Sequence, residues 1–481
     1  MNQELTPLKT ALENYKNKDI IPFDVPGHKH GVGTEELRDF FGSELMKIDV
    51  NSMKCLDILS NPISVIKEAQ LLLADAYNCD YGFFLVNGTT CGIQAMIMSI
   101  CKPMDKIILP RNVHKSALNG LILSGAIPIY INPKTHKDLK ISMNISFKDV
   151  KKTIDENPDA KAIFVINPTY FGFVSDLKKI IEYAHKKNLI VLVDEAHGAH
   201  FNFHDDLPNQ AMQLGADMSC VSLHKTGGSL TQSSALLINE QRIKRENIQN
   251  ILNLTQSTSA SYLLMSSLDL ARKILATRGQ QILSNSLKLV RYAREEINKI
   301  DGLYAFSKEI IDNENIYDFD ETKLAINVSN LGLSGFEVYD LLADDYNIQM
   351  ELADSYNILA IISLGDTINN IKKLIEALRN ISLKYKKEKL KLLNINLKNP
   401  EVIVSPRDAF YTLKTRIKLE DSIGEISGES IMAYPPGIPI IAPGERITQE
   451  IINYLRILQN EHTIITGLKD SSLEYIEILK Y

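Results

Sequence analysis

The stretch LIVLVDEAHGAH (Leu189–His200) decides the fold, because an apolar run ends directly in a cluster of acids and histidines. A short apolar run bounded by turn residues fits a fully buried strand. Similar runs occur at Lys106–Pro110, Ile127–Ile131 and Ala162–Pro168. Helical patterns such as Asp176–Asn188 separate some of them. Apolar strands that alternate with helices predict an α/β fold with a mostly parallel sheet, covered on both faces.

Polar residues follow the end of each predicted strand. In parallel sheets, ligands bind at the carboxyl ends of the strands. We therefore expect five polar groups to face one rim of the sheet: Asn87–Thr90, Arg111–His114, Asn167–Gly172, Asp194–His197 and Ser222–Lys225.

The chain has 481 residues, enough for two or three domains. Residues 1–60, with a turn-rich centre, predict an N-terminal arm, and residues 61–300 form the large domain that carries the alternation. Shorter pieces at 301–390 predict a small α+β domain, and residues 391–481 a C-terminal α+β region.

Composition and charge exclude several classes of protein. Hydrophobic residues make up 44% and charged residues 23%, which is a globular balance rather than a disordered one. The net charge of −6 offers no basic field for nucleic acid or anionic lipid. The first residues lack the apolar core of a signal peptide, and no apolar run approaches the ~18 residues of a membrane span. We expect a cytoplasmic protein; its five scattered cysteines, without a CxxC pair, predict reduced thiols.

Three local patterns are candidates for chemistry. At Asn87–Thr90, a strand ends and a Gly/Thr turn opens a helix, which suits an anion but also serves as an ordinary N-cap. Asp194 ends a buried strand, where a carboxylate needs a cationic cofactor atom, a metal or a neighbouring side chain. The spacing of His197 and His200 does not favour a metal. Lys225 follows another apolar run and is either a Schiff-base lysine or a surface lysine.

The order of these patterns is more specific than any one of them. An anion turn, an aspartate that ends a strand, and a lysine 31 positions after it resemble the fold-type-I enzymes of pyridoxal 5′-phosphate (PLP). The motifs narrow the resemblance to the shorter form of the Orn/Lys/Arg decarboxylase class-I family. They are PGHKHG (Pro26–Gly31), IKEAQ (Ile66–Gln70), FLVNGTTCGIQAMI (Phe84–Ile97), PRNVHKS (Pro110–Ser116), PTYFG (Pro168–Gly172), VDEAHGAHF (Val193–Phe201), HKTGGSLTQSS (His224–Ser234) and YPPGIP…PGE (Tyr434–Glu445).

The resemblance implies a PLP site with assigned roles. Lys225 forms the Schiff base with the cofactor, Asp194 keeps the pyridine nitrogen protonated, and His114 stacks on the ring. The family implies phosphate contacts from Thr89, Thr90, Ser222 and His224, with Gly88 letting the backbone approach the phosphate. It also implies that His197 lies near the cofactor's 3′-oxygen and that Ser257 reaches the phosphate across a dimer interface.

The implied reaction is decarboxylation of a basic amino acid through the Lys225 Schiff base and a quinonoid intermediate. Arginine is the first candidate substrate, followed by lysine and ornithine, and the products are agmatine, cadaverine and putrescine. His224 or a residue of the partner chain is the candidate proton donor, and no metal is expected. The family also implies a homodimer or larger homo-oligomer with sites at the interface.

Some residues depart from the family pattern and leave the substrate open. Ile58 stands where the family usually has an acid, Ser64 where it has glycine, and Glu425 where it has arginine. The side chains that could meet the substrate are His28, Glu351 and Asp354, although the last two also fit a solvated loop.

Two alternative functions remain open. The first is another PLP reaction such as transamination, which needs an arginine clamp for the substrate carboxylate, with Arg416 or Arg446 as candidates. The second is a non-catalytic regulatory homologue. The presence of Lys225, Asp194 and His114 argues against the second, because a protein without catalysis does not need them.

Overall fold

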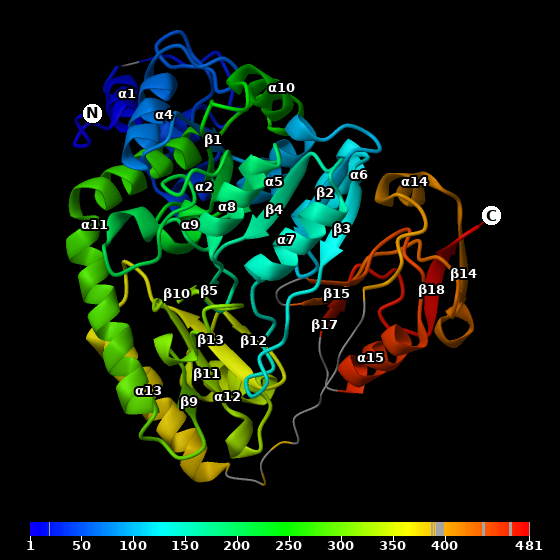
Figure 1. Ribbon diagram of the computed structural model, residues 1–481. Coiled ribbons are helices and arrows are strands. Elements are labelled where there is room, and N and C mark those ends of the chain that lie inside the picture. Colours follow the sequence, from blue (N-terminus) through cyan, green and yellow to red (C-terminus); the bar gives the residue numbers. More distant parts are fainter. Residues whose placement is uncertain are drawn as a thin grey trace. The chain divides into compact units, whose positions relative to one another are not determined.

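The computed structural model describes residues 1–18, 20–385, 388, 390, 399–434, 438–460 and 464–480 (Figure 1). The chain forms two compact units, Met1–Ser99 with Val193–Leu283 and Ile100–Leu192 with Ser284–Tyr481. The four successive segments expected from the sequence stay a prediction. Residue 391, where the C-terminal region was expected to begin, and residues 435–437 of the YPPGIP motif lie outside the described residues.

A seven-stranded sheet has the strand order β1-β8-β7-β6-β4-β2-β3. Strand β8 is antiparallel to both β1 and β7, whereas β2 is parallel to β3 and β4. The strands are β1 (Tyr81–Leu85), β2 (Lys106–Pro110), β3 (Ile127–Ile131), β4 (Ala162–Ile166), β6 (Ile190–Asp194), β7 (Met218–Val221) and β8 (Ser234–Ile238). The expected sheet of apolar strands is confirmed, with β8 as an antiparallel member.

The first unit joins its strands by helices that begin directly after them. Helix α5 starts three residues beyond β1, and the single-turn helix α9 starts two residues beyond β7. Its helical elements are α1 (Pro7–Lys16), η1 (Lys29–Gly31), α2 (Glu35–Phe41), α3 (Ser43–Ile48), α4 (Val65–Ala76), α5 (Gly88–Ile100), η2 (Phe201–Phe203), α9 (Leu223–Thr226), α10 (Arg245–Thr255) and the first part of α11 (Tyr262–Ile297).

The second unit contains further α/β and α+β parts. Its helical elements are α6 (Lys115–Ser124), α7 (Phe147–Glu156), α8 (Leu177–Lys186), η3 (Lys308–Ile310), η4 (Ser329–Leu331), α12 (Gly335–Tyr346) and α13 (Ile368–Lys384). A four-stranded sheet has the order β12-β13-β11-β9, and a two-stranded sheet pairs β10 with β5. These strands are β5 (Phe173–Val174), β9 (Tyr304–Ala305), β10 (Asp318–Phe319), β11 (Lys323–Asn327), β12 (Leu352–Ala353) and β13 (Asn357–Ile361).

The C-terminal region, defined here as the described residues from 399 to 480, has a core of its own. Leu419, Ile431, Ile441 and Leu455 are among its fully buried members. Its elements are α14 (Pro406–Tyr411), β14 (Lys414–Lys418), η5 (Leu419–Ser422), β15 (Ile431–Tyr434), β16 (Ile438–Ile441), α15 (Gln449–Asn460), β17 (Ile464–Thr466) and β18 (Tyr475–Leu479).

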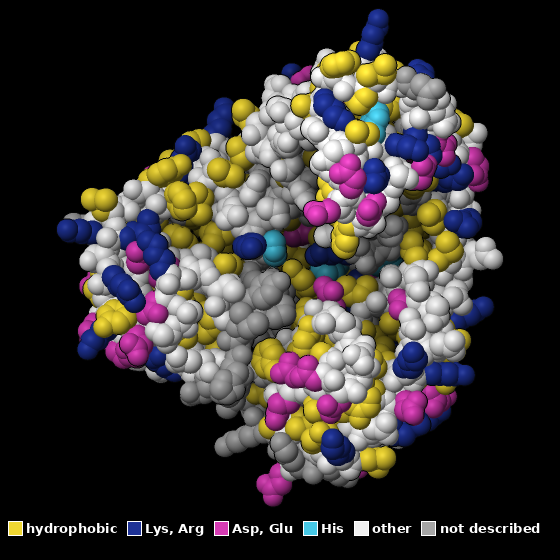
Figure 2. Space-filling model, turned by 180° about the vertical axis from the view of Figure 1, so that it is seen from behind, with side chains coloured by type: hydrophobic (Ala, Val, Ile, Leu, Met, Phe, Trp, Pro, Cys, Tyr) yellow, Lys and Arg dark blue, Asp and Glu magenta, His cyan; other side chains and the backbone are white. Residues whose placement is uncertain are grey.

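Figure 2 shows basic and acidic side chains interspersed on the face that it draws. Within the described ranges, no helix has both the length and the apolar character needed to cross a membrane.

Asp57 organises the loop before α4. Its buried carboxylate accepts hydrogen bonds from the backbone N–H groups of Ile58 (2.9 Å), Ile63 (3.1 Å), Ser64 (2.7 Å) and Ile66 (3.2 Å). Burial alone would raise the pKa of Asp57, but these N–H groups outweigh it and hold the pKa below its usual value.

Two departures from the family pattern lie in this same loop. Ile58 is 49% exposed, and the Ser64 N–H donates to the Asp57 carboxylate. The Ile58 side chain therefore lies outside the buried contacts of Asp57, whereas Ser64 takes part in them through its backbone.

Replacing the carboxylate should destabilise the protein, because Asp57→Ala leaves several backbone N–H groups without an acceptor. We expect Asp57→Ala to lower the free energy of unfolding by about 2–4 kcal/mol in urea titrations. The neighbouring exposed change Ile58→Asp is the matched control and should stay within about 0.5 kcal/mol. Equal losses in both variants would contradict the role of Asp57.

Candidate active site

Three hydroxyl groups from three elements meet at the start of α5. The Thr89 hydroxyl is hydrogen-bonded to the Ser222 hydroxyl and donates to Ser234 Oγ at 2.9 Å. All three side chains are buried. They meet because β8 lies between β1 and β7, so that Ser234 lies beside the residues that follow the other two strands. Thr90, the next residue of α5, is partly exposed.

Open space lies in front of Gly88. This residue has a φ of +72°, and a Cβ added to it would meet nothing nearer than the Gln232 carbonyl oxygen at 3.8 Å. The Gln232 side chain donates to the Val86 carbonyl oxygen at 2.7 Å and so holds the neighbouring loop against the turn. The first N–H groups of α5, which have no partner within the helix, and the nearby hydroxyls suit an anion such as a phosphate.

Asp194 is the last residue of β6, and its side chain is buried. Its Oδ1 accepts a hydrogen bond from the Ala196 N–H at 3.1 Å. Burial raises the pKa of Asp194, while the Ala196 N–H and the charge of Lys225 act in the opposite direction. A carboxylate in this setting favours a cation beside it.

Lys225 lies on the single turn α9, in the same unit as Asp194. Its Nζ is 2.9 Å from Nε2 of the buried His197, and either nitrogen can donate. The neighbouring His224 donates from Nδ1 to the Ser233 carbonyl oxygen at 2.8 Å, which places the Nδ1 proton and leaves Nε2 as the other ring nitrogen.

These residues fit PLP. The hydroxyl trio with Gly88 and Thr90 would hold the phosphate, Asp194 would pair with the pyridine nitrogen, and Lys225 would supply the amine. One unit thus contains an anion cradle, a buried carboxylate and an amine. Among the described residues, no three His, Cys, Asp or Glu side chains form a group that could hold a metal ion.

Ser257 follows α10 and lies beside the turn that begins α5. Its N–H donates to Asn87 Oδ1 at 3.5 Å, and its hydroxyl accepts from the Ser259 N–H at 3.2 Å. Gln256 fixes this segment, because its side chain accepts from the Val86 N–H at 2.9 Å. The predicted reach of Ser257 to a partner's phosphate stays a prediction.

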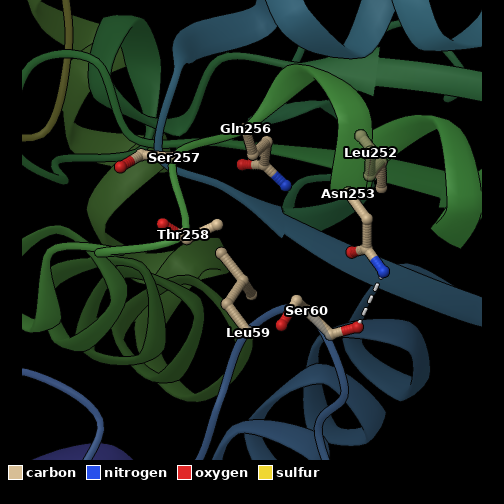
Figure 3. Close-up of a pocket in the computed structure, with 7 residues that line it drawn as sticks. All are labelled: Leu59, Ser60, Leu252, Asn253, Gln256, Ser257 and Thr258. Atoms are coloured by element: carbon tan, nitrogen blue, oxygen red, sulfur yellow. Dashed lines mark hydrogen bonds between the residues drawn. The ribbon is translucent and has the colours of Figure 1, made fainter.

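A small pocket adjoins this segment (Figure 3). Figure 3 shows the Leu59 and Thr258 side chains close together, and Asn253 donates to the Ser60 carbonyl oxygen at 3.0 Å. The full lining is Leu59, Ser60, Leu252, Asn253, Gln256, Ser257 and Thr258. The pocket therefore joins the Asp57 loop to the segment that carries Ser257.

His114 belongs to the second unit, where it is the N-cap residue of α6. Its Nδ1 accepts from the Ser116 N–H at 3.2 Å and lies 2.9 Å from the Ser116 hydroxyl. An accepting Nδ1 places the proton of a neutral ring on Nε2. The local contacts thus fix the tautomer of this imidazole and keep Nδ1 beside Ser116.

The three expected substrate contacts differ in their local settings. The Asp354 carboxylate stabilises its own turn, because its Oδ1 accepts from the N–H groups of Tyr356 (2.8 Å) and Asn357 (2.7 Å). Glu351 is exposed and precedes β12. In the first unit, His28 Nε2 lies 3.2 Å from Asp49 Oδ2.

The two arginines considered as carboxylate clamps have partners of their own. Arg416 pairs with Asp470 at 3.1 Å. Arg446 donates to the Gly424 carbonyl oxygen at 2.8 Å. The charge-reversing departure Glu425 is an exposed residue of the same C-terminal region.

Sequence reasoning considered Glu195 only as a possible metal ligand with His197 and His200, whereas the structure shows a fully buried carboxyl with partners of its own. Its Oε1 accepts from the Ala211 N–H at 2.8 Å, and its Oε2 accepts from the Ser219 hydroxyl at 2.7 Å. Burial, with a smaller contribution from the Asp194 charge, raises the pKa of Glu195 to about 8.

The raised pKa of Glu195 predicts a pH dependence of stability. Between the usual value of 4.5 and about 8, the unfolded chain is ionised here while the folded protein keeps its proton. The stability contributed by this group is complete below pH 4.5 and is lost as the pH rises through 8. Between pH 5.5 and 8, the free energy of unfolding measured in urea titrations should fall on the order of a few kcal/mol more for wild type than for Glu195→Gln. Parallel pH profiles would contradict this assignment.

Comparisons with known proteins agree with this geometry. The family model described as Orn/Lys/Arg decarboxylase, major domain, matches residues 6–370, and the model of its C-terminal domain matches residues 391–471. An arginine decarboxylase of Bacillus subtilis (strain 168) is 44% identical and covers 100% of this chain and 99% of its own length. The inducible lysine decarboxylase of Escherichia coli (strain K12) is 23% identical and covers 95% of this chain and 77% of its own.

A solved structure shares the fold. The lysine decarboxylase LdcF of Francisella novicida superposes with a TM-score of 0.83 at 21% identity, covering 99% of this chain and 81% of its own. The expected PLP fold type I is confirmed. The chain belongs to the Orn/Lys/Arg decarboxylase family of PLP-dependent enzymes.

Proposed function

We propose that this enzyme decarboxylates L-arginine to agmatine and CO2, with lysine and ornithine as poorer substrates. The observation that carries the proposal is the 44% identity, over the full chain, to an arginine decarboxylase. The grouping of Lys225, Asp194 and the hydroxyl trio in one unit supports PLP chemistry rather than a purely regulatory role. Arginine carries a cation at its end, as do lysine and ornithine, so side-chain selection rests on acidic groups.

PLP, when bound, supplies an electron sink for the electron pair that remains on Cα after CO2 leaves. Lys225 would hold the cofactor through its amine. The Asp194 carboxylate would keep a proton on the pyridine nitrogen. His197, at 2.9 Å from Lys225 Nζ, is placed to move a proton at that nitrogen.

The remaining roles concern orientation and selection. His114, whose tautomer is fixed by Ser116, would contact the cofactor ring. His224 is the candidate proton donor to Cα; because its Nδ1 proton is held by the Ser233 carbonyl oxygen, donation from Nε2 would require the doubly protonated imidazolium. Of the acidic candidates, Glu351 is the better partner for the guanidinium of the substrate, since Asp354 is engaged in its own turn.

The active enzyme is a cytoplasmic homodimer or larger homo-oligomer. Exposed apolar side chains on the first unit favour an interface there, among them Phe23 (95% exposed), Phe40 (82%) and Leu254 (77%). In such a dimer, Ser257 contributes to the phosphate site of the partner.

The reaction and its substrate can be tested together. Purified enzyme with PLP should release CO2 from arginine with a kcat/KM at least tenfold above that for lysine or ornithine, without a keto acid, and agmatine should be the product. A faster rate on lysine would contradict the choice of arginine. A reaction that depends on a keto acid would favour transamination instead.

The roles of two site residues can be tested by substitution. Lys225→Ala should abolish both turnover and the visible absorbance of the bound cofactor, because the amine is lost. Asp194→Asn should lower kcat by about 10²-fold or more, because a neutral pyridine is a weak electron sink. The control Lys273→Ala removes a lysine of the same unit that pairs with Glu4 on the surface, and it should keep wild-type rates. Normal turnover in Lys225→Ala would exclude the proposed mechanism.

A further inference from the structure

A buried ion pair connects the end of β2 with the C-terminal region. The Arg111 guanidinium donates from Nη1 to Glu445 Oε1 and from Nη2 to Glu445 Oε2, the latter at 2.9 Å. Only 9% of Arg111 and 1% of Glu445 is exposed. The two residues lie 334 positions apart in the sequence and belong to the same compact unit. A bidentate pair of this kind fixes orientation as well as distance.

Additional contacts hold both members of the pair. Arg111 Nη2 donates to the Ile440 carbonyl oxygen at 3.0 Å, and its guanidinium lies 4.7 Å from the centroid of the Tyr130 ring. Glu445 Oε2 also accepts from the Ala442 N–H at 2.7 Å. The arginine is thus held from β3 and from the segment around β16, and removal of its partner would leave a buried charge unpaired.

Arg111 of this pair lies three residues before His114, the N-cap residue of α6. The Arg111 N–H donates to the Ile131 carbonyl oxygen at 2.8 Å, which fixes the backbone at the end of β2. At the other end of α6, a Cβ added to Gly125 would lie 3.2 Å from Arg407 Cδ of α14. The C-terminal region therefore contacts the chain at both ends of α6.

We propose that the Arg111–Glu445 pair is a positioning link through which the C-terminal region holds His114 in its working orientation. Through this link, the C-terminal region contributes to the position of an active-site residue as well as to its own fold. The proposal rests on the proposed function, because it requires that His114 contacts the cofactor.

The alternative is a purely structural role, in which the pair stabilises the unit without affecting His114. Glu429 provides the matched control, since it is also a buried carboxylate of the C-terminal region. Among the described residues, the Glu429 carboxylate accepts from backbone N–H groups of that same region, those of Lys469 (2.8 Å) and Glu477 (3.0 Å). Glu429→Gln perturbs the region without touching the loop of His114.

The test compares Glu445→Gln, Glu429→Gln, His114→Ala and the double variant Glu445→Gln/His114→Ala. Three quantities are measured: kcat/KM for arginine, the dissociation constant of PLP from the reconstituted apoenzyme, and the urea midpoint of unfolding. If the link acts through His114, Glu445→Gln should lower kcat/KM at least tenfold and weaken PLP binding several-fold. Glu429→Gln should keep kcat/KM and PLP binding within twofold of wild type, even if its urea midpoint falls as far as that of Glu445→Gln. The double variant should be no worse than His114→Ala alone.

Two outcomes would overturn the link while leaving the proposed function intact. One is a Glu445→Gln enzyme with kcat/KM and PLP binding within twofold of wild type. The other is a double variant whose losses multiply, which would show that Glu445 acts independently of His114. A His114→Ala enzyme with wild-type kcat/KM and PLP binding would instead contradict both the stacking role and the link. Should Glu445→Gln fail to fold, Arg111→Lys keeps the charge but loses the bidentate geometry, and the same comparison with His114→Ala applies.

Discussion

The buried charge of Asp194 is the constraint on which the rest of the site depends. Its carboxylate ends a strand of apolar residues and receives one backbone hydrogen bond, from the Ala196 N–H. An ion in such surroundings is costly unless a positive charge lies near it. Lys225 supplies part of that charge in the protein itself, and a protonated pyridine nitrogen would supply the rest. The neighbouring acid is engaged elsewhere, because the Glu195 carboxyl accepts from the Ala211 N–H and the Ser219 hydroxyl.

Patterns that are local in sequence predicted most of the fold. The runs at Lys106–Pro110 and Ile127–Ile131 are strands with the expected bounds, because each contains its own apolar signal and turn residues. The same reasoning found Thr89 and Ser222, since both follow strand ends. It did not find Ser234, the third hydroxyl, because that residue begins an apolar strand and meets the others only through the order β1-β8-β7.

Residues that act through distant partners could not be read from the chain. Nothing in the sequence near Arg111 indicates a partner 334 positions away, and buried Glu445 ends a family motif to which the sequence assigned no role. Asp354 is the opposite case, a residue whose sequence setting suggested a functional contact but whose partners are local. Its sequence setting allowed either a substrate contact or a solvated loop, whereas its carboxylate is engaged by the backbone of its own turn. Hydrogen-bond geometry, rather than residue type, separates these cases.

The departures from the family pattern bear on substrate choice through their positions. Ile58 and Glu425 are exposed, and Ser64 donates its backbone N–H to the Asp57 carboxylate. None of the three takes part in the hydroxyl trio or in the Lys225–His197 pair. Because these groups would bind the cofactor, the departures leave cofactor chemistry unchanged. In the proposed function, selection among cationic side chains rests on an exposed acid such as Glu351, because a planar guanidinium would bind a carboxylate bidentately and an ammonium would not.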